Sequence, residues 1–189
     1  MKKDIILAGV GGQGILTIAT IIGDAATVAG LNLKQAEVHG MSQRGGSVVT
    51  YVKYGERVDS PVICRGEADV ILSFEQLEAA RWLPYLKKGG TLVTNIQKIN
   101  PMPVITGAAQ YPAQLVEKIQ AAGMDIDAFD ALSLAEQAGS AKAVNIVLMG
   151  RLSKYFDIPA DEWLSAIEAS VPPKFLELNK KAFQLGLEA

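Results

Sequence analysis

A glycine-rich segment near the N-terminus has the spacing of a nucleotide-binding turn. The segment reads Gly9-Val10-Gly11-Gly12-Gln13-Gly14, and its first, second and last glycines satisfy the pattern Gly-x-Gly-x-x-Gly. In this pattern the glycines allow a tight turn, a close approach of the backbone to a ligand, and close packing of a helix on a strand. An anion can then bind the free N–H groups at the start of the helix. The alternative is that the glycines only build the turn, because the motif specifies a fold more strongly than a ligand.

An acidic residue, Glu37, stands where a ribose-binding carboxylate is expected. It follows Gly14 by 23 residues (37 minus 14), near the end of the second predicted strand. Dinucleotide-binding folds place an Asp or Glu at about this distance, where it accepts a hydrogen bond from a ribose hydroxyl. The candidate cofactor-binding residues are therefore Gly9, Gly11, Gly12, Gln13, Gly14 and Glu37.

A second polar group follows Glu37 in a loop with three glycines. The loop reads His39-Gly40-Met41-Ser42-Gln43-Arg44-Gly45-Gly46 and lies at the carboxyl end of the second predicted strand. Open α/β sheets bind ligands at that edge, and an arginine there can hold a carboxylate or phosphate through two hydrogen bonds. The alternative is a solvated turn in which the glycines supply positive φ angles. The candidate substrate-facing or subunit-facing residues are His39, Ser42, Gln43, Arg44, Gly45 and Gly46.

Several kinds of catalysis are excluded or disfavoured by the residues present. Cys64 and His39 are the only cysteine and the only histidine, so neither a four-thiolate iron–sulfur cluster nor a closed Cys/His zinc site can form. No Gly-x-Ser-x-Gly elbow or Walker A pattern occurs, and we assign no catalytic residue and no metal ligand. We expect Cys64 to be buried or inert, and an aspartate cluster to be a solvated strand end. The cluster consists of Asp125, Asp127 and Asp130.

Size and charge indicate one globular domain over residues 1–189. The chain has a mass of 20.1 kDa and is 49% hydrophobic, and a chain of this length buries roughly 70% of its unfolded surface. With 20 acidic and 18 basic residues it lacks the basic excess of a nucleic-acid-binding protein. Gly23 and Asp24 interrupt the apolar segment that could otherwise suggest a membrane span. The lone cysteine favours a reducing, cytoplasmic location.

The glycine turn is flanked by elements that predict a strand–helix–strand unit. The pattern predicts a strand at Ile5–Ala8, a helix at Ile15–Ala29 ended by Gly30, and a strand at Asn32–Val38. The right-handed crossover rule then implies a parallel sheet. Residues 47–54 predict a further strand that turns at residues 55–56 and returns over residues 57–60, which would insert an antiparallel hairpin.

The rest of the chain continues the α/β pattern. We expect strands at residues 68–73, 91–95 and 126–131, helices from residue 75 (interrupted by Pro84) and over 115–122, an extended connection at 99–112, and helices from residue 134 onward. The predicted fold is a Rossmann-like three-layer α/β sandwich with a mainly parallel sheet and a helical C-terminal part.

The first predicted helix is apolar almost all round. Its polar residues form one narrow stripe of Thr17, Thr20, Asp24 and Thr27. A helix of this kind is buried on most sides. The sheet can cover only one of these sides, so we expect a further element or another chain to cover more.

The glycine segment and the loop at residues 37–46 together resemble the gamma-type domain of the 2-oxoacid:ferredoxin oxidoreductases. The similarity extends to Ala68–Leu72 and to Pro172–Asn179 near the C-terminus. Within this family the loop, the length and the ending are most similar to the small (beta) subunits of the indolepyruvate branch. The pyruvate, 2-oxoglutarate and branched-chain branches remain alternatives, as does a stand-alone dinucleotide-binding protein or NAD-dependent oxidoreductase.

The resemblance implies a part in an oxidative decarboxylation. An aryl-2-oxoacid, coenzyme A and oxidised ferredoxin would give an aryl-acyl-CoA, carbon dioxide and reduced ferredoxin, with thiamine diphosphate, magnesium and iron–sulfur clusters as cofactors. This chain has one cysteine and no Gly-Asp-Gly…Asn pattern for magnesium-bound thiamine diphosphate, since Gly23-Asp24-Ala25 lies inside a predicted helix. We therefore expect the cofactors on a larger partner subunit, and no turnover by this chain alone.

Overall fold

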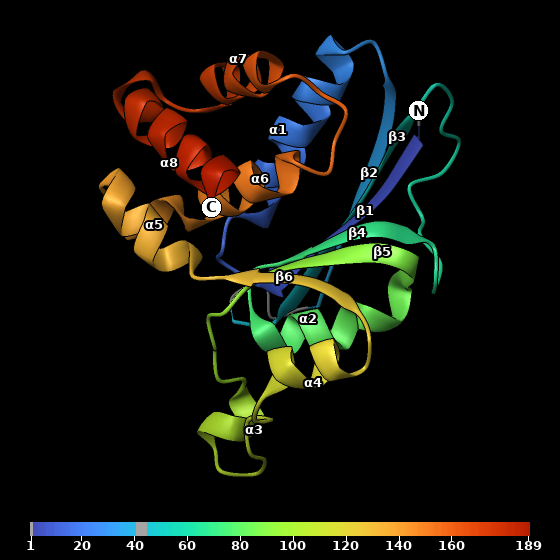
Figure 1. The fold of residues 1–189 in the computed structure, drawn as a ribbon, viewed down its shortest axis with the longest axis vertical. Coiled ribbons are helices and arrows are strands. Elements are labelled where there is room, and N and C mark those ends of the chain that lie inside the picture. The colour runs from blue at the N-terminus through green and yellow to red at the C-terminus, as the bar shows by residue number, and fades with distance from the viewer. Residues whose placement is uncertain (1, 41–44) are drawn as a thin grey trace.

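The computed structural model describes residues 2–40 and 45–189 (Figure 1). Its strands are β1 (Lys2–Val10), β2 (Asn32–His39), β3 (Ser47–Gly55), β4 (Ala68–Ser73), β5 (Leu86–Asn95) and β6 (Asp125–Phe129). Its helices are α1 (Ile15–Val28), α2 (Gln76–Trp82), α3 (Met102–Ile105), α4 (Leu115–Ala121), α5 (Ala131–Ala138), α6 (Val144–Ser153), α7 (Ala160–Ser170) and α8 (Leu176–Glu188). Short 3-10 turns cover Leu83–Tyr85, Ala141–Ala143 and Pro173–Phe175.

The strands described form one mixed sheet in the order β2-β3-β1-β4-β5-β6. The pairs β1–β4, β4–β5 and β5–β6 are parallel, whereas β3 runs antiparallel to both of its neighbours, β1 and β2. The predicted α/β class, the mainly parallel sheet and the inserted antiparallel hairpin are confirmed. The placement of the hairpin is wrong, because its two strands are β2 and β3, and residues 57–60 form no strand. Strands β1 and β2 point the same way but are separated by β3.

Helices cover both faces of the sheet and make three layers. Helices α1 and α5–α8 lie on one face, and α2 and α4 lie on the other (Figure 1). Alternate residues of β1 divide between the two cores: Ile5 and Leu7 pack in the larger core with α1 and the C-terminal helices, and Ile6 and Ala8 pack in the smaller one. All four side chains are fully buried, which explains the continuous apolar sequence of this strand.

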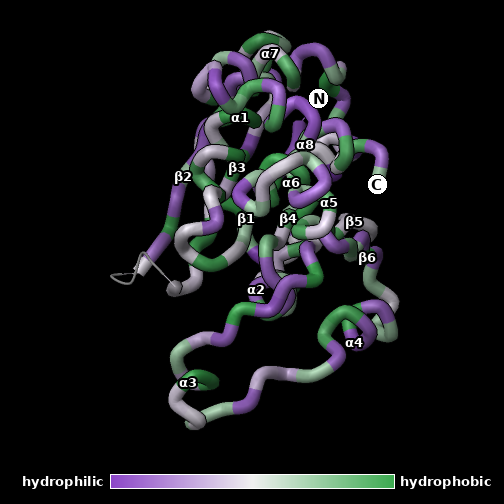
Figure 2. Tube along the Cα trace, turned by 90° about the vertical axis from the view of Figure 1, so that its left-hand side faces the viewer, coloured by the Kyte–Doolittle hydropathy of each residue, from purple (hydrophilic) through white to green (hydrophobic). Residues whose placement is uncertain are grey.

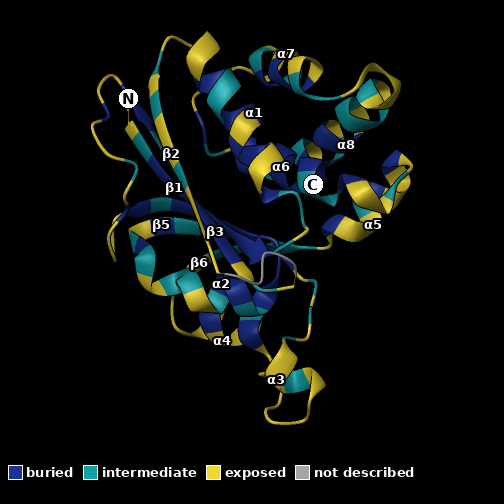
Figure 3. Ribbon diagram, turned by 180° about the vertical axis from the view of Figure 1, so that it is seen from behind, coloured by how far each residue is buried: buried dark blue, intermediate teal, exposed yellow. Residues whose placement is uncertain are grey.

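Helix α1 is buried by neighbours in the same chain. All of its isoleucines and alanines are buried, and α7 packs along it; the hydroxyl of Ser170 donates to Asp24 Oδ2 at 3.0 Å. The expectation that a further element covers this helix is therefore confirmed by α7 (Figure 3). The helix ends beside Gly30, which adopts a φ of 73°, as the sequence predicted.

The C-terminal helices α6 and α8 cross at very short range. A Cβ atom built on Gly186 would lie 1.9 Å from the carbonyl oxygen of Val147, and one on Gly150 would lie 2.1 Å from that of Phe183. Only glycine at both positions allows the two backbones to approach so closely. This crossing holds the first turn of α6 beside the glycine turn after β1.

Within the two stretches of chain described, no helix is long and apolar enough to cross a bilayer. The longest of those helices, α1, has 14 residues.

Candidate functional site

The two candidate segments meet at the carboxyl end of β1. The N–H group of Gly11 donates to the carbonyl oxygen of Gly46 at 2.8 Å, and the N–H group of Gly45 donates to that of Gly11 at 3.2 Å. The residues Val10 and Ser47 are partners in the register of β1 and β3. Because β3 starts beside the point where β1 ends, the second loop is tied to the glycine turn by backbone hydrogen bonds.

The side chain of Gln13 holds the glycine turn in place. Its Oε1 atom accepts a hydrogen bond from the N–H group of Val10 at 2.8 Å, and its Nε2 atom donates to the carbonyl oxygen of Phe74 at 3.2 Å and to Gln97 Oε1 at 3.4 Å. These bonds connect the turn to the ends of β4 and β5. The side chain of Gln13, which is half-buried, therefore stabilises the turn through these hydrogen bonds.

Three glycines of the turn are required for different physical reasons. A Cβ atom on Gly9 would lie 2.9 Å from the Cβ atom of Phe74, so this glycine allows close packing. Gly12 and Gly14 have φ angles of 105° and 78°, which side-chain-bearing residues rarely adopt. A Cβ atom on Gly14 would also lie 2.7 Å from Asn145 Nδ2 at the start of α6.

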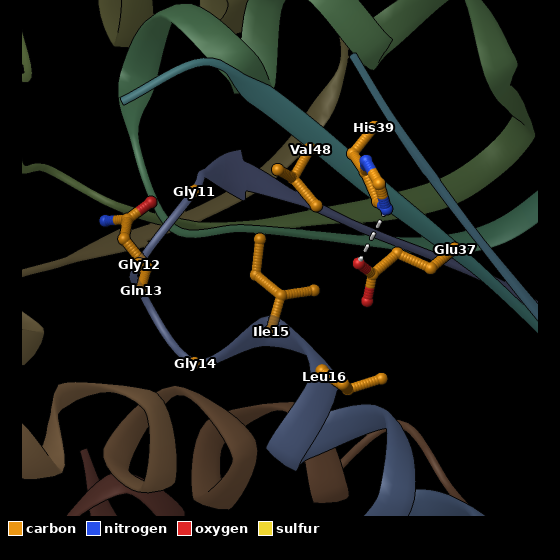
Figure 4. Close-up of a pocket in the computed structure, with 9 residues that line it drawn as sticks. All are labelled: Gly11, Gly12, Gln13, Gly14, Ile15, Leu16, Glu37, His39 and Val48. Carbon is orange, nitrogen blue, oxygen red and sulfur yellow. Dashed lines mark ion pairs between the residues drawn. The ribbon is translucent and has the colours of Figure 1, made fainter. Parts of the chain in front are cut away.

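A pocket of about 320 Å³ opens between the glycine turn, α1 and β2 (Figure 4). Its lining consists of Gly11, Gly12, Gln13, Gly14, Ile15, Leu16, Glu37, His39 and Val48. The side chains of Glu37 and His39 project from β2 towards the first turn of α1, with Glu37 Oε1 and His39 Nε2 3.9 Å apart. The predicted convergence of Glu37 and the glycine turn is present in the structure.

The electrostatics of this pocket differ between its two sides. Gly14 begins α1 without a side chain that could cap it, and the unsatisfied N–H groups of a first helical turn carry a partial positive charge. The opposite side carries the Glu37 carboxylate. Such a pocket can bind an anionic group at the helix and a hydroxyl at the carboxylate, which are two functional groups of a nucleotide.

A second pocket of about 540 Å³ lies on the other side of the glycine turn. It shares Gly12, Gln13 and Gly14 with the first, and its other lining residues are Gln97, Ile99, Leu132, Ala141, Lys142, Val144 and Asn145. Gln97, Lys142 and Asn145 were not among the candidate residues predicted from the sequence. They come from the end of β5 and the start of α6, and no local motif marks them, so only the folded arrangement brings them to the site.

Part of the second candidate group lies outside the described residues. These are Ser42, Gln43 and Arg44, together with their neighbour Met41. The members of the group that the structure describes are His39, Gly45 and Gly46. Gly45 has a φ of 75°, and the Nδ1 atom of His39 lies 3.2 Å from the carbonyl oxygen of Gly40.

Two expectations about residue environments are wrong in part. Cys64 was expected to be buried or inert, and it is exposed, which excludes the first of these and leaves an inert thiol as the prediction. Of the three clustered aspartates, Asp125 and Asp130 are exposed as expected, and Asp130 also caps α5 by accepting the N–H group of Ser133 at 3.1 Å. Asp127 is instead half-buried and accepts two hydrogen bonds from Arg151 at 2.6 and 2.9 Å, a partner that the sequence pattern did not reveal.

The residues present do not fit the cofactors of 2-oxoacid oxidation. No cluster of three or more His, Cys, Asp or Glu side chains within residues 2–40 and 45–189 could hold a metal ion. The one thiol, on Cys64, cannot supply the set of ligands that an iron–sulfur cluster needs. Asp24 lies inside α1 and accepts a hydrogen bond from Ser170, so it is not placed as a magnesium ligand.

Comparisons with known proteins match the whole chain. The family model described as pyruvate ferredoxin/flavodoxin oxidoreductase matches residues 4–189. The indolepyruvate oxidoreductase subunit IorB of Thermococcus kodakarensis is 46% identical over 197 aligned positions, which cover 100% of this chain and 96% of that one.

Solved structures have the same fold. A keto/oxoacid ferredoxin oxidoreductase gamma subunit from Geobacter sulfurreducens superposes with a TM-score of 0.74 at 25% identity, over 98% of this chain and 96% of that one. A 2-oxoglutarate:ferredoxin oxidoreductase from Magnetococcus marinus superposes with a TM-score of 0.73 at 20% identity, over 99% of this chain but only 30% of that longer one. The chain therefore belongs to the pyruvate ferredoxin/flavodoxin oxidoreductase family.

Proposed function

We propose that this chain is the small subunit of a cytoplasmic indolepyruvate:ferredoxin oxidoreductase and consists of one domain over residues 1–189. The complex would oxidatively decarboxylate an aryl-2-oxoacid to an aryl-acyl-CoA and pass the electrons to ferredoxin. The observation that carries this proposal is the 46% identity, over the full length of the chain, to a protein named as an indolepyruvate oxidoreductase subunit.

The metal-binding side chains available in this chain support a complex in which another subunit holds the cofactors. One cysteine cannot ligate a cluster, and the described residues contain no metal-binding group for a magnesium diphosphate. We infer that a larger partner subunit carries thiamine diphosphate, magnesium and the iron–sulfur clusters. This chain would contribute binding surface and no redox centre.

The pocket between the glycine turn and β2 is our candidate for binding the nucleotide part of coenzyme A. The backbone at Gly11, Gly12 and Gly14 and the start of α1 would face a phosphate, and Glu37 would accept a hydrogen bond from a ribose hydroxyl. Arg44 remains a proposed partner for an anionic part of coenzyme A or of the oxoacid. In this proposal Gly9 and Gln13 shape the turn and make no contact with the ligand.

The assembly test compares the isolated chain with the complex. We expect no oxidation of indolepyruvate with ferredoxin or a viologen dye by this chain alone, and CoA-dependent turnover when the larger subunit is co-expressed. Within the complex, indolepyruvate and other aryl-2-oxoacids should give a higher kcat/KM than pyruvate or 2-oxoglutarate. Turnover by the isolated chain would contradict the proposal. A preference for pyruvate would assign the complex to another branch of the family.

The site test uses Glu37→Gln in the assembled complex. Loss of the carboxylate should raise the KM for coenzyme A about tenfold, the effect of one lost charge-assisted hydrogen bond, and leave kcat nearly unchanged. The matched control is Glu117→Gln on α4, an exposed acid on the opposite layer. The same assay on Arg44→Ala tests that residue, since an unchanged KM would remove it from ligand binding.

A calorimetric titration separates the proposal from the dinucleotide-binding alternative. The isolated chain should show no tight binding of NAD or NADH, whereas stoichiometric binding at micromolar affinity would favour a stand-alone dinucleotide-binding protein.

A further inference from the structure

The chain between β5 and α4, residues 96–114, forms a projecting arm with the short helix α3 near its tip. Figures 1 and 2 show from two directions that α3 lies away from the sheet and from the layers of helices that cover it. We refer to residues 96–114 as the arm. All of its residues are exposed or half-buried.

Hydrogen bonds to the buried carboxylate of Glu75 fix the base of the arm to the rest of the protein. Glu75, at the start of α2, is only 1% exposed. Its Oε1 atom accepts hydrogen bonds from the N–H group of Ile99 at 3.1 Å and from the hydroxyl of Tyr111, which lie on the two sides of the arm. Its Oε2 atom accepts the N–H groups of Leu77 and Glu78 at 2.7 and 3.0 Å. The arm is thus held in a defined position.

The composition of the arm is that of an interface core. It contains no Asp or Glu and one lysine, Lys98, whereas about four of these 19 residues would be charged at the chain's 20% charged content. Large apolar side chains are nevertheless exposed on it: Met102 and Ile105 at 64% each and Ile96 at 43%. Depletion of charge together with exposed methionine and aliphatic residues is typical of the buried centre of protein interfaces.

The half-exposed guanidinium of Arg81 borders this apolar surface, next to the buried carboxylates of Glu75 and Glu78. A pocket of about 480 Å³ beneath the arm is lined on one side by Met102 and Ile105 and on the other by Glu78 and Arg81. The Nε atom of Arg81 donates to Glu78 Oε1 at 3.1 Å, and the guanidinium remains half exposed while the carboxylate is buried. A partner complementary to this surface would have an apolar groove with a carboxylate at its rim, facing Arg81.

We propose that the arm docks into an apolar groove of the larger subunit of the oxidoreductase. This inference rests on the proposed function. The Magnetococcus marinus oxidoreductase carries the same fold as 30% of a longer chain, so there the fold is joined to further polypeptide of an oxidoreductase. The Thermococcus kodakarensis relative that matches the whole of this chain is likewise named as a subunit of an oxidoreductase, so that enzyme contains further polypeptide that can cover such a surface.

The binding test measures the affinity between this chain and the larger subunit that co-purifies with it. Met102→Asp and Ile105→Asp should each weaken binding about tenfold or more, because they place a charge in the desolvated centre of the interface. The matched control is Val28→Asp, which adds the same charge at a position that is 65% exposed at the end of α1. Circular dichroism and thermal melts of the isolated variants show whether they still fold.

Cross-linking identifies what the arm contacts. In a Cys64→Ser background, Ile105→Cys carrying a photoactivatable benzophenone should cross-link to the larger subunit, and Val28→Cys should not. Cross-links only between copies of this chain, or arm variants that bind as tightly as wild type, would overturn the docking proposal and leave the proposed function intact. Failure of the wild-type chain to bind any larger subunit would overturn both.

Discussion

Single residues at the candidate site are selected by backbone geometry as much as by side-chain chemistry. Gly12 and Gly14 supply positive φ angles, and Gly14 also gives the side chain of Asn145 room at the start of α6. The motif predicted the first role, because it follows from local spacing. It could not predict the second, since Asn145 lies 131 positions further along the chain (145 minus 14).

Gly14→Ala should destabilise the fold more than Gly12→Ala. Both substitutions force alanine into a left-handed conformation at a cost of about 1–2 kcal/mol, but only Gly14→Ala also brings a methyl group against Asn145. We expect a loss of about 2–4 kcal/mol for Gly14→Ala in the free energy of unfolding, measured with urea. Adding Asn145→Ala should recover part of that loss, and equal losses for the two glycine variants would contradict the packing argument.

Residue types alone gave wrong environments where the partner is distant in sequence. Asp127 looked like part of a solvated strand end, but Arg151 reaches it from α6. Glu37 was placed correctly, because the carboxyl ends of β1 and β2 lie at the same edge of the sheet whatever strand separates them. Long-range pairing, rather than residue character, decides these cases.

At the scale of elements, the positions of buried strands and of helices with clear end signals could be predicted from the sequence. Which strands pair with each other could not. Ala68–Ser73 was predicted to the residue because it is a continuous apolar run, and α1 was predicted to within one residue because Gly14 and Gly30 delimit it. The predicted hairpin partner of β3 was wrong: the turn signal at residues 55–56 predicted a returning strand at residues 57–60, whereas β3 pairs with the preceding strand β2. Which strands pair depends on the burial of both faces, and no local pattern encodes that.

The α6–α8 crossing gives a prediction with an internal control. Gly186→Ala should lower the free energy of unfolding by more than about 3 kcal/mol or prevent folding, because its methyl group would overlap the carbonyl oxygen of Val147. Gly23→Ala, also in a helix, meets only Leu33 Cδ2 at 3.6 Å and should stabilise the protein by about 0.5–1 kcal/mol. Opposite signs in thermal or urea unfolding would support the close crossing, and a neutral Gly186→Ala would contradict it.

At the scale of the whole molecule, the layers explain why only half of the candidate site was predictable. The glycine turn and Glu37 come from the first strand–helix–strand unit, which local sequence specifies. Gln97 and Asn145 belong to the other half, and they arrive only when β5 and the C-terminal helical layer pack beside that unit. The ion pair of Asp127 with Arg151 adds a charged contact between that helical layer and the edge strand β6, beside the apolar core that packs the layer on the sheet.

This attachment predicts a dependence of stability on acid pH. Burial raises the pKa of Asp127, but hydrogen bonds from Arg151 and Tyr155 and the charge of Arg151 outweigh it, so the pKa lies below its usual value. A carboxyl with a lower pKa in the folded state than in the unfolded state stabilises the fold above the unfolded value of about 3.9. That contribution is lost as the pH falls through the folded-state pKa.

Asp127→Asn tests the attachment directly. It should lower the free energy of unfolding at pH 7 by about 1–3 kcal/mol, because it leaves the half-buried charge of Arg151 without a counter-ion, and it should flatten the pH dependence below about pH 4. Asp59→Asn, in the exposed pair with Arg57, should cost less than about 1 kcal/mol and keep the wild-type slope. Urea unfolding of all three proteins between pH 3 and 7 gives the comparison. An Asp127→Asn protein with the wild-type slope would show that the helical layer is held to the sheet by its apolar packing alone.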